Sequence, residues 1–287
     1  MVRLVIAVGT LATTIVAASA APKEQQTGAS RVALATVLDP KNRPLMDVGP
    51  DDFVVQEAGA AREVLSVRPA DYPIAIMLDT GGEAHNDVPL MRKAVTRFLE
   101  KIGTRPVAVG TFGDIPAMVS TFEDDRATVV KRLGEIELTT ATGSSLLQGT
   151  ALAAHAIQRT GALFSTIIVL SSSSLDSSRD RPDEMIAPIV DSGAILHVIA
   201  NRSSPPPAGP GFRPAQALRA LAEQSRGQYT TIYSAVSFQS ALDRLAERLT
   251  SELLIEYIVP SGSKPNDVKV GVRLAGARVK GLGVAPK

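Results

Sequence analysis

The stretch Ile74-Ala-Ile-Met-Leu78, followed directly by Asp79, decides the fold of this 287-residue chain. Five consecutive apolar residues without polar alternation are typical of a strand buried on both faces of a parallel sheet. The residues that follow change to helical spacing between positions 88 and 102. A buried strand followed by an amphipathic helix is the repeating unit of a parallel sheet covered by helices. The sequence therefore predicts an α/β fold with Asp79 at the carboxyl end of a central strand.

The alternation of strand and helix continues as far as residue 253. It predicts a doubly wound, mostly parallel sheet with helices on both faces over residues 71–253. Ligands of such sheets bind beyond the carboxyl ends of the strands. The loops after Leu78, Ile136 and Leu170 therefore form the candidate binding rim. The remaining elements predicted in this region are strands at 106–112, 165–170, 194–200 and 228–233, and helices at 124–136, 144–158, 183–190, 215–225 and 236–253.

Segments with β-type alternation flank the α/β region on both sides. Residues 31–70 contain candidate strands at 32–38, 52–57 and 63–67, and residues 254–287 contain others at 254–259, 268–274 and 278–282. Neither segment alone has enough strands with an apolar face to be stable. We therefore expect both segments to pack together as one small sheet beside the α/β domain.

The first 20 residues are typical of a secretory signal peptide. Arg3 precedes an uncharged apolar stretch, and small residues then lead to a cleavage site between Ala20 and Ala21. The alternative, an uncleaved anchor, is disfavoured because the apolar stretch is shorter than the roughly 20 residues of a span. Residues 21–30 are predicted to be a flexible polar segment, and no later segment predicts a membrane span. We expect an exported protein, either periplasmic or secreted.

Composition excludes several classes of function. The 30 basic and 29 acidic side chains nearly cancel, so there is no electrostatic case for a nucleic-acid partner. The chain has no Cys, which excludes disulfides, thiolate metal sites and a cysteine nucleophile. No Trp is present either. Imidazole chemistry is limited to three histidines: His85, His155 and His197.

The order of the segments resembles the von Willebrand factor type A domain, in particular an exported bacterial subfamily. Residues 37–45 and 52–57 resemble its leading β module. Ile76-Met-Leu-Asp-Thr-Gly-Gly-Glu83 resembles the first core strand and metal loop, and Val109-Gly-Thr-Phe-Gly-Asp114 resembles the next strand. Thr142-Gly-Ser-Ser145 and Ile168-Val-Leu-Ser-Ser172 resemble the second and third metal loops. The resemblance implies a Rossmann-like fold that binds protein partners through these loops.

The resemblance also implies a metal-ion-dependent adhesion site, whose pattern is incomplete here. Asp79 matches the aspartate of the first loop, Asp-x-Ser-x-Ser. Gly81 and Glu83 occupy the two serine positions, Ser144 occupies the threonine position of the second loop, and Ser172 occupies the aspartate position of the third. Mg²⁺ requires near-ideal octahedral oxygen coordination, and these changes remove ligands that it needs. We therefore expect a degenerate site without metal or other cofactor.

Three functional hypotheses follow. The first is a non-enzymatic module that binds an envelope or extracellular protein without metal. The second is a Mg²⁺-dependent adhesin in which Glu83, or Asp176 from the third loop, restores coordination at Asp79. The third is a serine hydrolase that uses the Ser171–Ser174 run, which requires one of the histidines as a base. No Gly-x-Ser-x-Gly motif accompanies these serines.

Overall fold

The computed structural model describes residues 28–136, 143–173, 176–178, 181–202 and 214–285. The predicted signal peptide and its cleavage site at Ala20 and Ala21 lie outside these residues. The first strand, β1 (Gly28–Leu38), begins inside the segment that was expected to be flexible. It does so because Gly28 and the residues after it pair with the distant strand that ends at Pro260.

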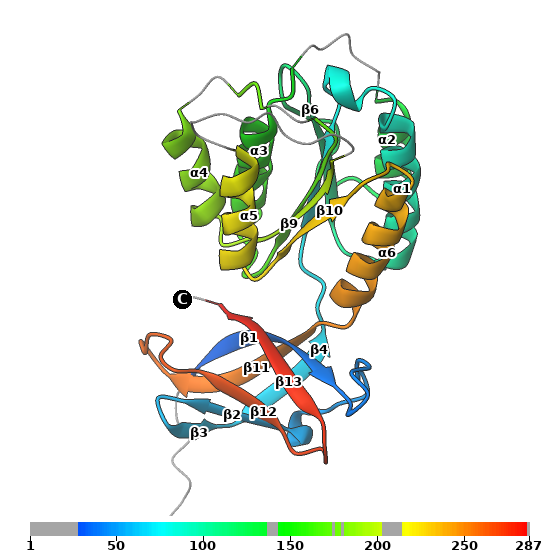
Figure 1. Ribbon diagram of the computed structural model, residues 1–287. Coiled ribbons are helices and arrows are strands. Elements are labelled where there is room, and N and C mark those ends of the chain that lie inside the picture. Colours follow the sequence, from blue (N-terminus) through cyan, green and yellow to red (C-terminus); the bar gives the residue numbers. More distant parts are fainter. Residues whose placement is uncertain (1–27, 137–142, 174–175, 179–180, 203–213, 286–287) are drawn as a thin grey trace, which may run out of the picture.

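A six-stranded sheet forms the centre of the larger domain, in the order β10-β9-β8-β5-β6-β7 (Figure 1). All neighbouring strands are parallel except the short edge strand β7, which is antiparallel to β6. The predicted α/β fold class is therefore confirmed. The strands are β5 (Ile74–Asp79), β6 (Val107–Phe112), β7 (Ala117–Met118), β8 (Thr166–Ser171), β9 (Ile195–Asn201) and β10 (Gln228–Ile232).

Helices cover both faces of this sheet (Figure 1). One face carries α1 (Val88–Lys101), α2 (Arg126–Gly134) and α6 (Ser237–Thr250), and the other carries α3 (Leu146–Gln158), α4 (Pro182–Asp191) and α5 (Pro214–Gln224). Strand β5 explains why two cores form. Ile74, Ile76 and Leu78 belong to the core under α1 and α6, whereas Ala75 and Met77 belong to the core under α3. Successive side chains of a strand point to opposite faces, so a buried central strand needs apolar residues at every position.

The terminal segments form a β module below the α/β domain (Figure 1). Its seven strands make two antiparallel sheets, β13-β1-β11-β4 and β12-β2-β3, not the single small sheet that we expected. The second sheet exists because one four-stranded sheet would leave its lower apolar face in water. Side chains such as Val37, Phe53 and Tyr257 fill the core of the module. The strands not yet given are β2 (Phe53–Glu57), β3 (Ala60–Arg62), β4 (Val64–Pro69), β11 (Leu253–Pro260), β12 (Lys269–Val272) and β13 (Arg278–Val284).

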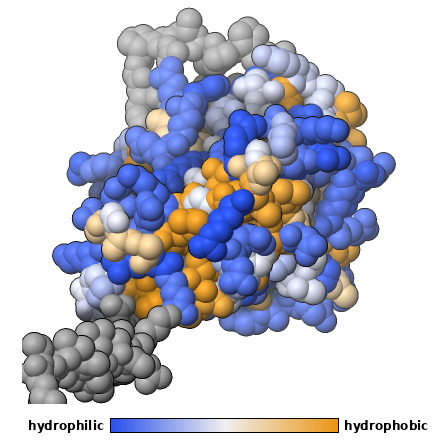
Figure 2. Space-filling model, turned by 90° about the horizontal axis from the view of Figure 1, so that it is seen from below, coloured by the Kyte–Doolittle hydropathy of each residue, from blue (hydrophilic) through white to orange (hydrophobic). Residues whose placement is uncertain are grey.

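The second sheet covers the core of the module incompletely. Figure 2, which views the molecule from below, shows hydrophobic residues at the centre of this face. Several aliphatic residues that pack against the module core stay partly exposed, among them Val64, Val67, Val270 and Val272. Short 3-10 helices, η1 (Pro50–Asp52) in the module and η2 (Gly82–Ala84) after β5, complete the described elements.

Two crossings of the chain join the module to the α/β domain, and they lie side by side. The amide of Ala70 donates to the carbonyl oxygen of Glu252 at 2.9 Å. The hydroxyl of Tyr72 donates to the buried carboxylate of Glu252. The guanidinium of Arg105 lies 4.6 Å from the centre of the Tyr72 ring and donates to the Leu249 carbonyl at 2.6 Å. Burial raises the pKa of Glu252, and the Tyr72 hydroxyl partly offsets this effect. These contacts hold the two crossing segments against each other at the edge of the α/β domain.

Within the described residues, no helix is both long enough and apolar enough to cross a membrane.

Candidate functional site

Asp79 lies fully buried at the carboxyl end of β5, where the strand enters the loop that contains η2. Four donors surround its carboxylate. Oδ1 accepts from the Gly81 amide at 3.0 Å and from the Ser144 hydroxyl at 3.1 Å. Oδ2 accepts from the amides of Ser172 and Ser173 at 3.0 and 2.8 Å. The side chain thereby joins three loops that lie far apart in the sequence.

Two opposing effects act on the charge of Asp79. Burial is the larger one and raises the pKa of its carboxyl group, because the ionised form loses its hydration. The amides of Gly81, Ser173 and Ser172 donate to the ionised form and lower the pKa in part. Oriented backbone amides therefore offset part of the cost of burying the ionised carboxyl group.

Ser172 also contributes through its side chain, but to a different carboxylate. Its hydroxyl donates to Asp87 Oδ2 at 2.7 Å, and Asn201 Nδ2 donates to the same oxygen at 2.9 Å. Sequence reasoning missed Asp87 and Asn201 as members of the site. Asn201 ends β9 at the same edge of the sheet where Asp79 ends β5, so a comparison of strand ends could have found it. Asp87 immediately precedes α1 and carried no such signal.

Asp176 lies in the third loop but does not turn toward Asp79. Its Oδ1 accepts from the Leu146 amide at 2.9 Å, at the first turn of α3, and from the amide and hydroxyl of Ser178 at 3.0 and 2.7 Å. Asp114 similarly accepts from the Gly143 amide at 2.8 Å. Both carboxylates thus order loop backbone. Among the residues described, no three His, Asp or Glu side chains gather as metal ligands would.

Comparison with solved structures identifies the architecture. A von Willebrand factor type A structure from Catenulispora acidiphila has 12% sequence identity and a TM-score of 0.51, and the match covers 92% of this chain and 74% of that chain. Proximal thread matrix protein 1 from the mussel byssus has 13% identity and a TM-score of 0.53, over 71% of this chain and 49% of that chain. The chain has the von Willebrand factor type A fold.

Further findings qualify this resemblance. The matched region of this chain corresponds to about half the length of the mussel protein. Another structure of the mussel protein, with 14% identity and a TM-score of 0.52 over 67% of this chain and 48% of that chain, has a zinc-occupied metal-ion-dependent adhesion motif. No family model matches the sequence, and no curated protein matches it.

The structure brings together four of the five positions inferred for the type A metal site. Asp79, Gly81, Ser144 and Ser172 meet at the carboxyl edge. Glu83 lies exposed in η2. Gly81 is packed so closely that an added Cβ would lie 2.6 Å from the Gly143 carbonyl oxygen and 2.9 Å from the Ser144 Cβ. The serine of the intact pattern therefore does not fit at position 81 unless the second loop moves.

The described serines of the Ser171–Ser174 run form no His-based pair. The Ser172 hydroxyl is bound to Asp87, the Ser171 hydroxyl is buried without a hydrogen-bond partner within the described part of the chain, and the Ser173 hydroxyl acts on Asp79, where it helps to lower the pKa of the carboxyl group. Ser174 lies outside the described residues.

The three histidines lie in different surroundings. His85 and His155 are exposed, and the ring of His155 contacts Gln158. His197 is buried inside β9, where desolvation lowers the pKa of its ring to about 3 and Arg248 adds to the effect. It is therefore a neutral core residue at ordinary pH.

Exposed apolar side chains flank the candidate site on the type A fold. Ile115 follows β6 and is 82% exposed, while Tyr233 and Val236 follow β10 and are 77% and 66% exposed. Both groups belong to loops at the carboxyl edge, because β6 and β10 are parallel to β5. The sequence predicted the binding rim in the loops after Leu78, Ile136 and Leu170, and it did not single out the loops after β6 and β10. Part of the loop after Ile136 lies outside the described residues.

Proposed function

We propose that this chain is an exported, non-enzymatic interaction module of the type A fold. It binds an envelope or extracellular protein through the loops at the carboxyl ends of the core strands, and it does so without metal. The observation that carries the proposal is the hydrogen bonding of Asp79. A carboxylate has about four lone-pair positions, and four protein donors occupy them. A cation at this point would have to displace those donors.

The remaining residues do not fit a Mg²⁺ ion either. Gly81 offers no ligand atom, and the hydroxyl of Ser172 is bound to Asp87. Mg²⁺ dehydrates reluctantly and demands octahedral geometry, so one buried, fully bonded carboxylate and an exposed Glu83 are a poor ligand set. In this proposal Asp79 does structurally what the metal does in an intact site, because it holds the three loops together.

The proposed contact surface consists of exposed apolar side chains around this polar centre. Ile115 lies toward one side of the sheet and Tyr233 toward the other, with the Asp79 loop between them. Large apolar side chains exposed near a concentration of loops are common in protein interfaces, where aromatic residues contribute much of the binding energy. A partner bound through them needs no metal bridge.

The proposal is tested by recovery of a cross-linked partner from native envelope extract. The wild type, Ile115→Ser and Tyr233→Ser are compared with Leu163→Ser. Leu163 is 53% exposed and precedes β8 at the opposite edge of the sheet, so it is a matched control. We expect both rim variants to lose the partner, the control to keep it, and EDTA to have no effect. Recovery that requires Mg²⁺ or Mn²⁺ and disappears in Asp79→Ala would establish the adhesin hypothesis instead.

Export is tested separately by N-terminal sequencing of the mature protein. We expect the sequence to begin at Ala21. A chain that retains Met1 in the cytoplasm would contradict export without bearing on the contact surface.

A further inference from the structure

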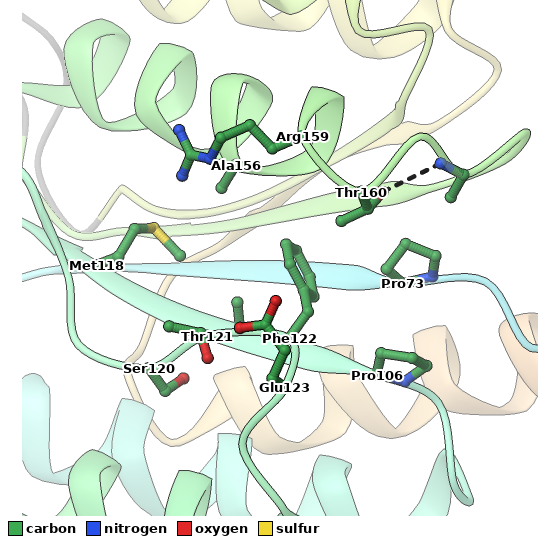
Figure 3. Close-up of a pocket in the computed structure, with 12 residues that line it drawn as sticks. Pro73, Pro106, Met118, Ser120, Thr121, Phe122, Glu123, Ala156, Arg159 and Thr160 are labelled. Atoms are coloured by element: carbon green, nitrogen blue, oxygen red, sulfur yellow. Dashed lines mark hydrogen bonds between the residues drawn. The ribbon is translucent and has the colours of Figure 1, made fainter.

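A cavity of about 610 Å³ lies at the amino-terminal edge of the six-stranded sheet, opposite the Asp79 loops (Figure 3). Pro73 and Pro106, which immediately precede β5 and β6, line it on one side. The end of α3 and the segment between β7 and α2 line the others. Its volume lies within the roughly 300–1,000 Å³ that is typical of small-molecule sites.

The body of the cavity is apolar. Figure 3 shows the Phe122 ring directed toward Thr160, with Met118 beside it. Most of the lining residues are aliphatic, aromatic or proline: Pro73, Pro106, Ala108, Met118, Phe122, Ala156 and Ala162. An occupant therefore needs an apolar body.

The lining hydroxyls of Ser120 and Thr160 already have partners. The Val109 amide donates to Ser120 Oγ at 2.7 Å. Thr160 Oγ1 donates to the Ile157 carbonyl at 2.7 Å and accepts from the Ala162 amide at 3.2 Å. These groups shape the cavity and are poorly placed to recognise a ligand.

Two ionisable side chains remain on the cavity lining, and they carry opposite charges. Arg159 belongs to the end of α3, and Glu123 belongs to the segment before α2. Figure 3 shows them on different sides of the cavity, with Met118 and Phe122 between them. Both are exposed, and neither forms an ion pair with any residue in the described ranges.

The walls of the cavity are held in place before any ligand arrives. Phe122 packs against the core under α3. Arg126 Nη2 donates to the carbonyls of Gly103 and Arg105 at 2.9 and 3.0 Å, which fixes the approach to Pro106. Preformed walls reduce the conformational entropy that binding would otherwise cost.

We propose that this cavity binds a small zwitterionic ligand with an apolar body, of which a short unblocked apolar peptide is the simplest case. The anionic end pairs with Arg159, the cationic end pairs with Glu123, and the apolar body covers Met118 and Phe122. This assignment uses both ionic groups and the apolar lining. It is independent of the function proposed for the carboxyl edge.

The test uses three probes on the full mature chain: trileucine, N-acetyl-trileucine and trileucine amide. Each blocked probe lacks one terminal charge. Titration calorimetry measures affinity, and the ¹³C-labelled Met118 methyl signal, assigned by Met118→Leu, reports the location. We expect saturable trileucine binding that shifts this signal. Each blocked probe should bind about two- to fivefold more weakly, which is the range for exposed ion pairs.

Two variants connect each charge of the ligand to one side chain. In Arg159→Gln, trileucine amide should bind as well as trileucine, while N-acetyl-trileucine stays weaker. In Glu123→Gln, the pattern should reverse. Both side chains are exposed, so each variant is a fold control for the other. The proposal is overturned if no probe binds saturably at 10 mM, if all three bind equally to the wild type, or if the Met118 signal does not move.

Discussion

Replacing Asp79 by Ala tests whether this side chain is a structural connector or a vacant metal ligand. In the structural role, its loss leaves the amides of Gly81, Ser172 and Ser173 without acceptors in a buried region. A metal ligand that is already without metal would be dispensable for stability. The two roles therefore predict different melting temperatures in the absence of any cation.

The magnitude follows from counting the orphaned donors. The Ser144 hydroxyl is free to rotate about its Cα–Cβ bond, but the three backbone amides are fixed. Each buried unsatisfied donor costs about 1–3 kcal/mol, and removal of a desolvated charge offsets part of the sum. We expect a net loss of about 3 kcal/mol in the free energy of unfolding. For a chain of this size, that corresponds to a melting temperature lower by about 6–12 °C.

The assay is thermal and urea denaturation in EDTA, repeated with millimolar Mg²⁺. Asp114→Ala is the matched control, because this exposed carboxylate accepts one loop amide, that of Gly143. The Asp114→Ala substitution should lower the free energy of unfolding by less than about 1 kcal/mol. Neither protein should respond to Mg²⁺. An Asp79→Ala melting temperature within a degree of the wild type, or a rise of several degrees in the wild type with Mg²⁺, would refute the reasoning.

Four other expectations concern stability. The pKa of His197 is about 3 in the folded chain and near 6.5 in the unfolded chain, so between pH 7 and pH 5 only the unfolded chain takes up a proton at this ring. The free energy of unfolding, measured by urea denaturation, should therefore fall by about 2 kcal/mol more in the wild type than in His197→Leu when the pH is lowered from 7 to 5. Gly81→Ser should lower the melting temperature, because even the Cβ of the new side chain would clash with the Gly143 carbonyl oxygen. A variant as stable as the wild type would show that the loop at Gly143 can move to make room. Tyr72→Phe removes a hydrogen-bond donor from buried Glu252 and should lower the free energy of unfolding, measured by urea denaturation, by about 2 kcal/mol. An unchanged denaturation midpoint would mean that water replaces the Tyr72 hydroxyl. A chain truncated after Leu253 loses most of β11 and all of β12 and β13, and circular dichroism should show earlier melting.

The sequence was most informative where burial alone determines structure. The run 74–78 has to be a central strand, because it presents apolar side chains to both faces. Element ends were less predictable. The final helix was expected to reach Leu253 but ends at Thr250, because Leu253 pairs with Pro69 in β11. An apolar run at that junction fits both helical and strand periods, so only the pairing partner decides.

The candidate site was predicted in part for a similar reason. Asp79 could be placed because strand ends in a parallel sheet share one edge. The role of Asp79 as a hydrogen-bond acceptor could not be predicted, because three of its four donors are backbone amides and every sequence provides backbone amides. The link from Ser172 to Asp87 depends on how the residue before α1 meets the ends of β8 and β9, which no local pattern encodes. The second sheet of the β module was missed because the pairing of β2 with β12 joins residues more than 200 positions apart.

The adjacency of the two crossings at Ala70 and Glu252 has a consequence for the order of folding. Strand β1 is made early in synthesis, yet its partners β11 and β13 are among the last segments made. Bringing such distant segments together costs loop-closure entropy, which slows folding. Once the α/β domain has folded, residues 70 and 252 are already in hydrogen-bonding contact, and the effective loop between the paired residues Ala35 and Leu253 shrinks from more than 200 residues to about 36. A folded α/β domain therefore lowers the entropic cost of assembling the β module, and until β11 and β13 are available β1 lacks both of its sheet partners.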